Sequence, residues 1–376
     1  MALAFMTYYF PNWHRDPWNE KWHGTGWTEW ECTKNAVPRF PGHFQPKIPL
    51  WGCQDESDPA EMEKKLAAAK SHGVDGFIFD WYWYNEGPYR LRCLEEGFFG
   101  AENSEDMKFA IMWANHSPSY VHPANRRDIV NGTQFLMDGH ITEETFIRAT
   151  DHCIKNYFWR KNYRRTSTGL YFCIFSGEML LQSFGSAENT RRILDGFRTR
   201  AAQAGYPKLD LTVIGDGWID GGDLREGLLR AKELGFDSVS AHGFPREDGF
   251  SEFPFVTFDG MWEKCFDLSE RFLAASRETG VNYYVSGGAG WDVSPRTVAS
   301  EIYEDIGYPF VRICNDDTPE KLERHLRRLR EIAESAGCEQ INFFAFNEWT
   351  EGGYLEPDSR FGYGKLEAVK AVFRRG

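Results

Sequence analysis

The sequence lacks several features that mark common classes of protein. Its eight cysteines form no CxxC pair, so no zinc ribbon or dithiol redox motif is visible. They stand at positions 32, 53, 93, 153, 173, 265, 314 and 338, and a chain of 376 residues is too large for a disulfide framework to be expected. No His, Asp and Cys residues show metal-ligand spacing, and we predict neither a metal nor another cofactor.

Positive charge and long apolar runs are also scarce. The chain has 43 Lys and Arg against 56 Asp and Glu, and this net charge of −13 argues against nucleic acid or an anionic membrane surface as a partner. No apolar run approaches the roughly 20 residues that a membrane helix needs. The first residues, MALAFMTYYF, lack the basic start of a signal peptide, so we expect a cytoplasmic protein unless a leader has been removed.

Aromatic residues, in contrast, are abundant. They make up 16% of the chain and include 14 Trp. A buried indole N–H needs a hydrogen-bond partner, so tryptophan is a demanding residue for plain core packing. The abundance favours a cleft whose indole faces stack on rings. An aromatic-rich core is the alternative, because Trp is usually partly exposed.

Short apolar segments alternate with helical patterns along the chain. The segments predicted as strands are 2–10, 73–84, 108–115, 169–176, 209–217, 237–244, 281–288 and 340–349. The helical patterns are one from Asp58 to Gly73, one capped by Thr142, and others near 189–204, 224–231, 257–279 and 318–336. Apolar strands alternating with helices indicate a parallel sheet, and eight repeats indicate a closed (β/α)8 barrel. We predict a single domain, 1–376, with long loops after the strands.

Polar and aromatic residues follow nearly every predicted strand. They are Asp80, Trp83, Trp113, Asn115, His116, Asp216, Trp218, His242, Trp291, Asp292, Asn347, Glu348 and Trp349. In a (β/α)8 barrel the carboxyl ends of the strands meet at one mouth, where active sites lie. Indole faces suit sugar rings, and carboxylates and amides suit hydroxyls. The mouth is therefore predicted to bind a carbohydrate, either an oligosaccharide or a polysaccharide.

The stretch FNEWTEGGYLEPD, residues 346–358, carries the candidate catalytic pair, Glu348 and Glu351. Glycosidic bond cleavage generally uses two carboxylates whose pKa values are driven apart by their surroundings. A straight strand would direct residues three apart to opposite faces. Gly352 and Gly353 permit a turn that brings both glutamates into one pocket. The alternative is a loop with two solvated glutamates.

Other residues are candidates for contact with the substrate. Asp80 and Asp292 suit hydroxyl groups but could equally cap loops, and His242 could hydrogen-bond a sugar or be a buried structural histidine. Trp83, Trp113 and Trp291 are either stacking platforms or core. The candidate substrate-binding residues are Tyr8, Trp27, Glu29, Asp80, Trp83, Trp113, Asn115, His116, His242, Trp291, Asp292, Asn347, Trp349 and Tyr354.

Seven stretches together resemble a known family. They are YYFPNWH, GTGWTEW, PGHFQPKIPL, DPAEMEKKLAAAKSHGVDGFIFDWYWYN, WAN, GWDVSPR and NEWTEGGYLEPD, and they span residues 8–358. The chain resembles the WbsX-like, or glycoside-hydrolase-family-99-like, proteins, which are related to endo-α-mannosidases. The resemblance implies a (β/α)8 barrel and an EWxE motif, here Glu348 to Glu351.

The resemblance also implies roles for the two glutamates. Glu348 would deprotonate the sugar 2-hydroxyl, which attacks its own anomeric carbon. Glu351 would protonate the leaving oxygen and then activate the water that opens the 1,2-anhydro intermediate, with retention of configuration. Such a mechanism requires a 2-hydroxyl trans to the leaving group, as in α-mannosides and α-L-rhamnosides.

One stretch, WANHSPSYVHP, departs from the family pattern. His116 stands where many members have an acidic residue, so the endo-mannosidase substrate is not transferred. Three functions stay open: a retaining α-glycosidase, a glycosyltransferase, as an older family assignment has it, and a carbohydrate-binding protein without catalysis. The absence of a DxD motif at a strand end argues against the second function, and the intact EWxE motif argues against the third. The oligomeric state stays open as well.

Overall fold

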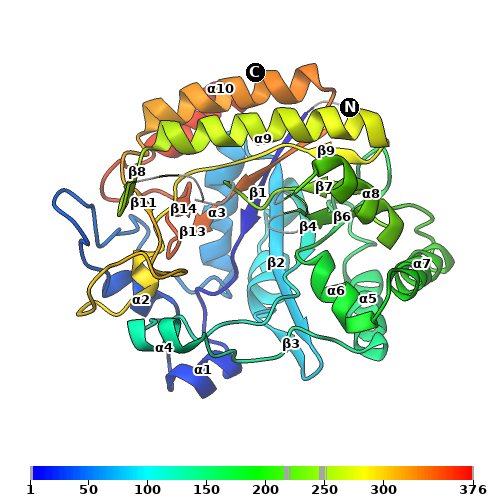
Figure 1. Cartoon of the computed structure of the whole chain (residues 1–376), viewed down its shortest axis with the longest axis horizontal. Helices are drawn as coiled ribbons and strands as arrows, with labels where there is room; N and C mark the ends of the chain where they lie inside the picture. The colour runs from blue at the N-terminus through cyan, green and yellow to red at the C-terminus, as the bar shows by residue number, and fades with distance from the viewer. Residues whose placement is uncertain (1–2, 216–218, 220–221, 245–249, 251, 375–376) are drawn as a thin grey trace.

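Eight parallel strands form the centre of the molecule (Figure 1). The computed structural model describes residues 3–215, 219, 222–244, 250 and 252–374. The barrel strands are β1 (Ala4–Tyr9), β2 (Gly76–Tyr84), β4 (Lys108–Trp113), β5 (Leu170–Ile174), β6 (Leu209–Ile214), β7 (Ser238–Ser240), β9 (Asn282–Tyr284) with β10 (Ser286–Gly288), and β12 (Gln340–Phe344). They confirm the predicted strand segments, although most of the strands are shorter than predicted.

The sheet closes into a barrel through a strand in two parts. The strand order is β10-β12-β1-β2-β4-β5-β6-β7-β9, and every neighbouring pair on this path is parallel. Only Val285 separates β9 from β10, and its carbonyl accepts a hydrogen bond from Asn342 N. The two ends of the path are therefore one strand, and the fold is the predicted (β/α)8 barrel.

Helices follow the strands and cover the outside of the barrel. They are α3 (Pro59–Ser71), α5 (Glu143–Asn156), α6 (Gly177–Phe184), α7 (Ala187–Gln203), α8 (Leu224–Leu234), α9 (Phe258–Thr279), α10 (Pro319–Ser335) and α11 (Gly364–Phe373). After β2 the helix is replaced by a π-helix, η1 (Cys93–Phe98), which packs beside α3. The sequence pattern did not predict α6, α11 or this π-helix.

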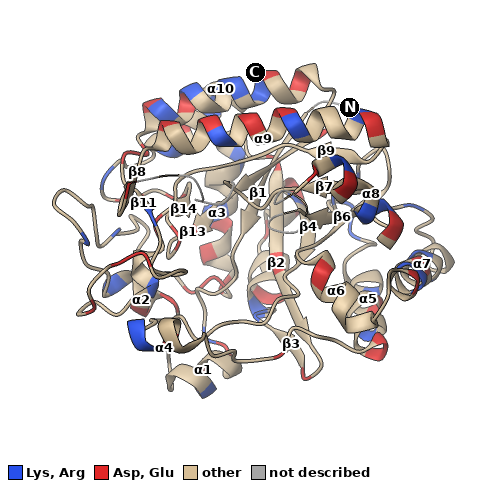
Figure 2. Cartoon of the chain, in the orientation of Figure 1, with Lys and Arg blue, Asp and Glu red and all other residues tan. Residues whose placement is uncertain are grey.

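Local chemistry explains where the predicted helices start. The Asp58 side chain accepts from Ala60 N at the start of α3, with Pro59 in the first turn, and Thr318 accepts from Lys321 N at the start of α10. Lys and Arg alternate with Asp and Glu along the outer faces of α9 and α10 (Figure 2). These helices bury an apolar stripe against the barrel and keep mixed charge toward solvent.

Strand alternation divides the core into two clusters. Side chains that point into the barrel include Met6, Ile78, Met112 and Tyr284. The opposite faces of the strands pack against the helices in a much larger cluster. The period of two means that a residue at a strand end faces either the barrel mouth or the helices, and its neighbour faces the other way.

Long loops surround the carboxyl ends of the strands. The loop after β1 contains α1 (Pro17–His23) and α2 (Trp30–Lys34), and the loop after β4 contains α4 (Arg126–Asn131). Figure 1 places these three short helices together, on the side to which β2 and its hairpin partner β3 (Gly87–Tyr89) point. Asp216 and Trp218, predicted at the end of β6, lie outside the described residues.

Candidate active site

A tight hairpin follows the last barrel strand and carries both candidate catalytic residues. Strand β13 (Asn347–Glu348) pairs antiparallel with β14 (Gly353–Tyr354), and Glu351 lies in the turn between them. A Cβ on Gly353 would lie 2.1 Å from the Phe344 ring. Gly352 has φ +73°, and a Cβ there would lie 2.7 Å from a backbone nitrogen. Only glycine fits this turn, which brings the two glutamates to one side as the sequence predicted.

Both glutamates converge on one buried guanidinium. Arg296, in the short 3-10 helix η3 (Ser294–Arg296), donates from Nη2 to Glu348 Oε1 at 2.7 Å and from Nη1 to Glu351 Oε1. The Tyr308 hydroxyl also donates to Glu351 Oε1, at 2.7 Å. Both of these hydrogen bonds to the Glu351 side chain are accepted by Oε1, and Oε2 has none from the described residues.

A third carboxylate stands behind the pair. Glu29 is fully buried, and its Oε1 accepts from Arg296 Nη2 at 3.0 Å and from the Thr350 hydroxyl. His122 Nε2 lies 3.3 Å from the same oxygen. Arg296 is thus one cation shared by three carboxylates, and the cluster carries an excess of negative charge.

This imbalance sets the protonation of the cluster. Burial, and then the charges of Glu351 and Glu29, raise the pKa of Glu348 well above its usual range, although Arg296 acts in the opposite direction. Burial would also raise the pKa of Glu29, but His122 and Arg296 hold that pKa well below the usual range. The two cations therefore favour the ionised form of Glu29, and burial with the neighbouring negative charges favours the protonated form of Glu348.

The hairpin and Arg296 form one wall of a cavity of about 750 Å³ at the carboxyl ends of the strands. Four more of the predicted residues line it: Asp80, His116, His242 and Trp291. Asp80 Oδ1 lies 4.0 Å from His242 Nε2, and burial raises the pKa of Asp80. Burial, together with the nearby positive charge of Arg90, lowers the pKa of His116 to about 4. His116 is therefore neutral near pH 7.

Two predicted stacking residues face the wrong way. Along β2, Asp80 and Tyr82 line the cavity, whereas Trp83 points outward and lies 5.1 Å from the His152 ring of α5. Along β4, Met112 lines the cavity and Trp113 is fully buried against Phe146. The alternation of strand faces is the reason, and neither indole can meet a ligand in this cavity.

Several other predicted residues position the site without lining it. Asn347 exchanges two 2.8 Å hydrogen bonds with the Phe10 backbone and so fixes Phe10, which does line the cavity. Asn115 similarly holds the Ser176 backbone at 2.8 and 2.9 Å. The Tyr8 hydroxyl donates to Ala241 O at 3.3 Å, inside the barrel.

The aromatic residues of the EWxE hairpin are also structural. Trp349 is fully buried, stacks on Tyr354 at 3.9 Å and donates to Glu356 Oε2 at 2.6 Å. Tyr354 is itself buried and donates to Asp358. Trp27 lies in the first loop, 4.2 Å from the His23 ring, and not on the cavity wall.

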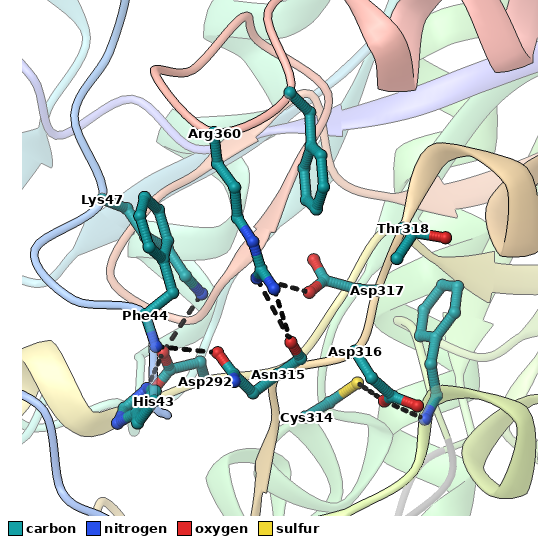
Figure 3. A network of polar contacts seen from close by, with 12 residues as sticks. His43, Phe44, Lys47, Asp292, Cys314, Asn315, Asp316, Asp317, Thr318 and Arg360 are labelled. Carbon is teal, nitrogen blue, oxygen red and sulfur yellow. Dashed lines mark hydrogen bonds and ion pairs between the residues drawn. The ribbon is translucent and has the colours of Figure 1, made fainter. Parts of the chain in front are cut away.

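Asp292 is a buried anchor and not a hydroxyl-binding residue (Figure 3). It accepts from Gln45 Nε2 at 2.6 Å and pairs with His43 at 2.9 Å and Lys47 at 3.1 Å, while its backbone N–H donates to Glu351 O at 2.6 Å. Burial alone would raise its pKa, but Lys47 and His43 hold that pKa well below the usual range. Asp292 therefore ties the first loop to the turn that carries Glu351.

Sequence reasoning missed several cavity residues, chiefly Arg296, Tyr308, Tyr82 and Arg90. Tyr82 could have been found by applying strand alternation to Asp80. Arg296 stands at the end of GWDVSPR, several residues beyond a strand end, and no local pattern assigns its side chain to the hairpin.

Three further observations on the described residues concern metal ligands, cysteines and membrane-spanning helices. No group of three or more His, Cys, Asp or Glu side chains among them could hold a metal ion. All eight cysteines are free thiols, and Cys153 and Cys173 are core residues. Within the same described part of the chain, every helix is too short or too polar to span a membrane.

The fold and the site define a (β/α)8 barrel with a carboxylate-lined cavity at the carboxyl ends of its strands. Solved structures with the same fold include the GH99 endo-alpha-mannosidase from Bacteroides thetaiotaomicron, which is 14% identical with a TM-score of 0.55 and aligns over 98% of this chain and 96% of that one. A glycoside hydrolase-like protein is also 14% identical, with a TM-score of 0.61, over 100% and 95% of the two chains.

The family follows from the sequence profile described as Glycosyltransferase WbsX, which matches residues 5–369. The chain belongs to this family. A curated relative, the uncharacterized protein WxcX of Xanthomonas campestris pv. campestris (strain B100), is 24% identical over 394 aligned residues. That alignment covers all of this chain and 50% of WxcX, so the chain spans about half the length of the curated relatives that it matches.

Proposed function

We propose that the protein is a retaining α-glycoside hydrolase acting on a manno-configured linkage, an α-mannoside or α-L-rhamnoside, within an oligosaccharide or polysaccharide. The observation that carries the proposal is the placement of Glu348 and Glu351 on one hairpin, both lining a cavity and both bound to Arg296. The glycoside hydrolase fold of the similar structures and the EWxE motif support it.

In the first step Glu348 acts as base and Glu351 as acid. The Glu348 carboxylate takes the proton of the sugar 2-hydroxyl while O2 attacks the anomeric carbon. The bond from that carbon to the leaving oxygen breaks, and Glu351 donates its proton to that oxygen. An internal nucleophile has a high effective molarity, so no carboxylate has to reach the anomeric carbon.

The second step reverses the two roles. Glu351, now a carboxylate, takes a proton from water, whose oxygen attacks the anomeric carbon. The ring bond to O2 opens, and O2 recovers its proton from Glu348. The raised pKa of Glu348 suits both steps, because a carboxylate of higher pKa is a stronger base and its acid form returns the proton at neutral pH.

A glycosyltransferase is the second candidate function, because the profile that matches the chain carries that description. A transferase would need a nucleotide sugar as donor and would turn over little or no glycan in its absence. The two functions therefore differ in what must be added to the assay.

The deciding experiment incubates the protein with aryl α-mannosides, aryl α-L-rhamnosides and bacterial polysaccharides, without nucleotide sugars, and follows released reducing sugar. We expect release by the wild type and a loss of roughly 10²–10⁴-fold in both Glu348→Gln and Glu351→Gln, the usual range for an acid or base. The matched control is Glu334→Gln, an exposed glutamate of α10 paired with Arg330. Release that persists in both variants would exclude this pair, and turnover only with a nucleotide sugar would favour the transferase.

A further inference from the structure

Within the described part of the chain, Arg90 is a cation of the cavity wall without a carboxylate partner for its side chain. Three arginines line the cavity, and Arg296 and Arg312 are paired, the latter with Asp305 at 3.0 Å. Arg90 is 6% exposed, and no described carboxylate lies within ion-pair distance of its guanidinium. Its Nε is buried without a hydrogen-bond partner among the described residues. A buried charge that lacks a counter-ion is unfavourable unless a ligand supplies one.

The surroundings of Arg90 hold its guanidinium in place. The group lies over the rings of Tyr89, Tyr82 and Phe10 at 4.3, 4.7 and 5.0 Å, and two of these rings also line the cavity. Aromatic faces stabilise a cation without neutralising it. They therefore fix the position of the charge; the Tyr89 hydroxyl takes up part of its hydrogen-bonding edge, and Nε has no partner among the described residues.

The backbone at Arg90 is strained. Among the described residues Arg90 is the one non-glycine residue with positive φ, at 61°. Its N–H donates at 3.0 Å to Asp16 Oδ2, the side chain that also caps α1. A bulky residue in this conformation persists only where its surroundings impose it, and such positions concentrate at functional sites.

A second unpaired nitrogen lies on the same wall. His116 Nδ1 is buried without a hydrogen-bond partner among the described residues, and its ring lies 6.1 Å from that of Tyr82, which itself stacks on Arg90. A planar guanidinium binds a carboxylate or sulfate through two parallel hydrogen bonds, and an adjacent imidazole N–H can add a third. Sugar hydroxyls would satisfy the hydrogen bonds but not the charge.

We propose that Arg90, assisted by His116, selects an anionic sugar residue, one that bears a carboxylate or sulfate group, within the glycan that occupies the cavity. This inference rests on the proposed function for the identity of the ligand as a glycan and adds its charge. The net charge of −13 repels acidic polymers in general, so a preference for an acidic glycan has to come from a local site such as this one.

The test measures binding and not turnover, and uses the full chain with Glu351→Gln to prevent hydrolysis. The probes are uronic-acid-containing oligosaccharides with their carboxyl-reduced forms, sulfated oligosaccharides with their desulfated forms, and GDP-mannose. We expect one acidic form to bind roughly ten- to a hundredfold more tightly than its neutral partner, the range of a charge-assisted hydrogen bond. Addition of Arg90→Gln should remove this ratio.

The matched control is Arg92→Gln, because Arg92 is exposed on the same segment and pairs with Glu96 at 2.9 Å. It should keep the ratio. Equal binding of acidic and neutral forms, a ratio that survives Arg90→Gln, or preferential binding of GDP-mannose would each overturn the inference. If the wild type hydrolyses only neutral glycans, the inference of an anionic sugar is wrong and the proposed hydrolase function stands. If the protein prefers acidic glycans but hydrolyses none, the inference stands and the proposed hydrolase function is wrong.

If Arg90→Gln does not fold, competition replaces it. Free glucuronate, or inorganic sulfate for a sulfated probe, should displace the bound oligosaccharide from the Glu351→Gln protein at concentrations at which glucose does not. Equal displacement by glucose would overturn the assignment.

Discussion

At the scale of single residues, Arg296 is the group through which three carboxylates influence one another. It touches Glu29, Glu348 and Glu351, and it was absent from the residues that the sequence predicted. Motifs placed the two glutamates because they lie within four residues of each other. They could not place Arg296, since its contact with Glu348 spans 52 residues and depends on how two loops fold.

The first prediction concerns the pH dependence of kcat/KM. Glu348 must be ionised to act as base, so activity should rise with pH through its raised pKa. Arg296→Gln removes a positive neighbour, raises that pKa further and should move the acid limb to higher pH. Glu29→Gln removes a negative neighbour, lowers that pKa and should move the limb to lower pH.

The measurement is a pH–rate profile of kcat/KM for the wild type and both variants. Glu31→Gln is a matched control, because Glu31 lies in α2 just beyond Glu29 and makes an exposed pair with Lys34. It should leave the profile in place. Shifts in the same direction for Arg296→Gln and Glu29→Gln would contradict the electrostatic account.

At the scale of elements, the β13–β14 hairpin and the alternation of β2 decide which residues reach the cavity. The sequence predicted the turn correctly because two glycines follow Glu351. The prediction that Trp83 and Trp113 line the cavity is wrong. It rested on which residue types occur at the strand ends and did not take into account which face of the strand each side chain is on. Asp80 sets the inward register of β2, so that error was avoidable.

The second prediction tests the hairpin. Gly353→Ala places a methyl group against the Phe344 ring and should destabilise the protein by about 1–3 kcal/mol, the usual result of overpacking. Because the displaced segment carries both glutamates, kcat should fall even where the protein stays folded. Thermal unfolding and kinetics at a temperature below the transition would measure the two effects separately.

Gly196→Ala is the control for this substitution. Gly196 lies inside α7, where a Cβ would meet nothing nearer than Arg200 at 3.6 Å. Alanine there should stabilise the protein by about 0.5–1 kcal/mol and leave kcat unchanged. A normal kcat in Gly353→Ala would show that the turn tolerates displacement.

At the scale of the whole molecule, the repeat of strand and helix determined what could be predicted. Eight apolar segments were enough to predict the barrel, and their number predicted that the sheet closes. The short helices of the loops and the π-helix after β2 were not predicted, because such short elements show little hydrophobic periodicity. The buried charge network also was not predicted, since His43 and Lys47 lie on the first loop and Asp292 on a loop far along the chain.

The third prediction concerns this buried charge. Asp292→Asn removes the counter-ion of buried Lys47 and should lower stability by about 3–5 kcal/mol at pH 7. The pKa of Asp292 is depressed in the folded state, so its contribution is present above the unfolded pKa of about 4 and is lost as pH falls. The gap in Tm between wild type and variant should therefore narrow toward pH 3.

The exposed pair of Lys70 with Asp106, at 2.8 Å, gives the comparison. Asp106→Asn should change stability by less than about 1 kcal/mol. A comparable loss of stability in both variants would mean that burial of the Asp292 network does not increase its contribution to stability.

The fourth prediction has the opposite dependence on pH. Because the folded-state pKa of Glu348 is raised, its share of stability is present below the unfolded pKa of about 4.3 and is lost as pH rises. Glu348→Gln should therefore raise Tm, on the order of a few degrees at pH 7 and less at pH 4. Calorimetry at both pH values would check this, and a Tm lowered at pH 7 would contradict it.

The contacts between the first loop and the last strand have a consequence for synthesis of the chain. Phe10 and Asn347 are 337 residues apart in the sequence, and Glu29 and Arg296 are 267 residues apart. At about 5–20 residues per second, a ribosome leaves the first loop without these partners for on the order of tens of seconds. The tryptophans of the first loop in a nascent chain therefore lack their final packing contacts until the last barrel strand has been synthesised. The proposed chemistry would then arrive in one step, once the segment that carries Glu348 and Glu351 is translated, and a chain that stops before Glu348 would have none of it.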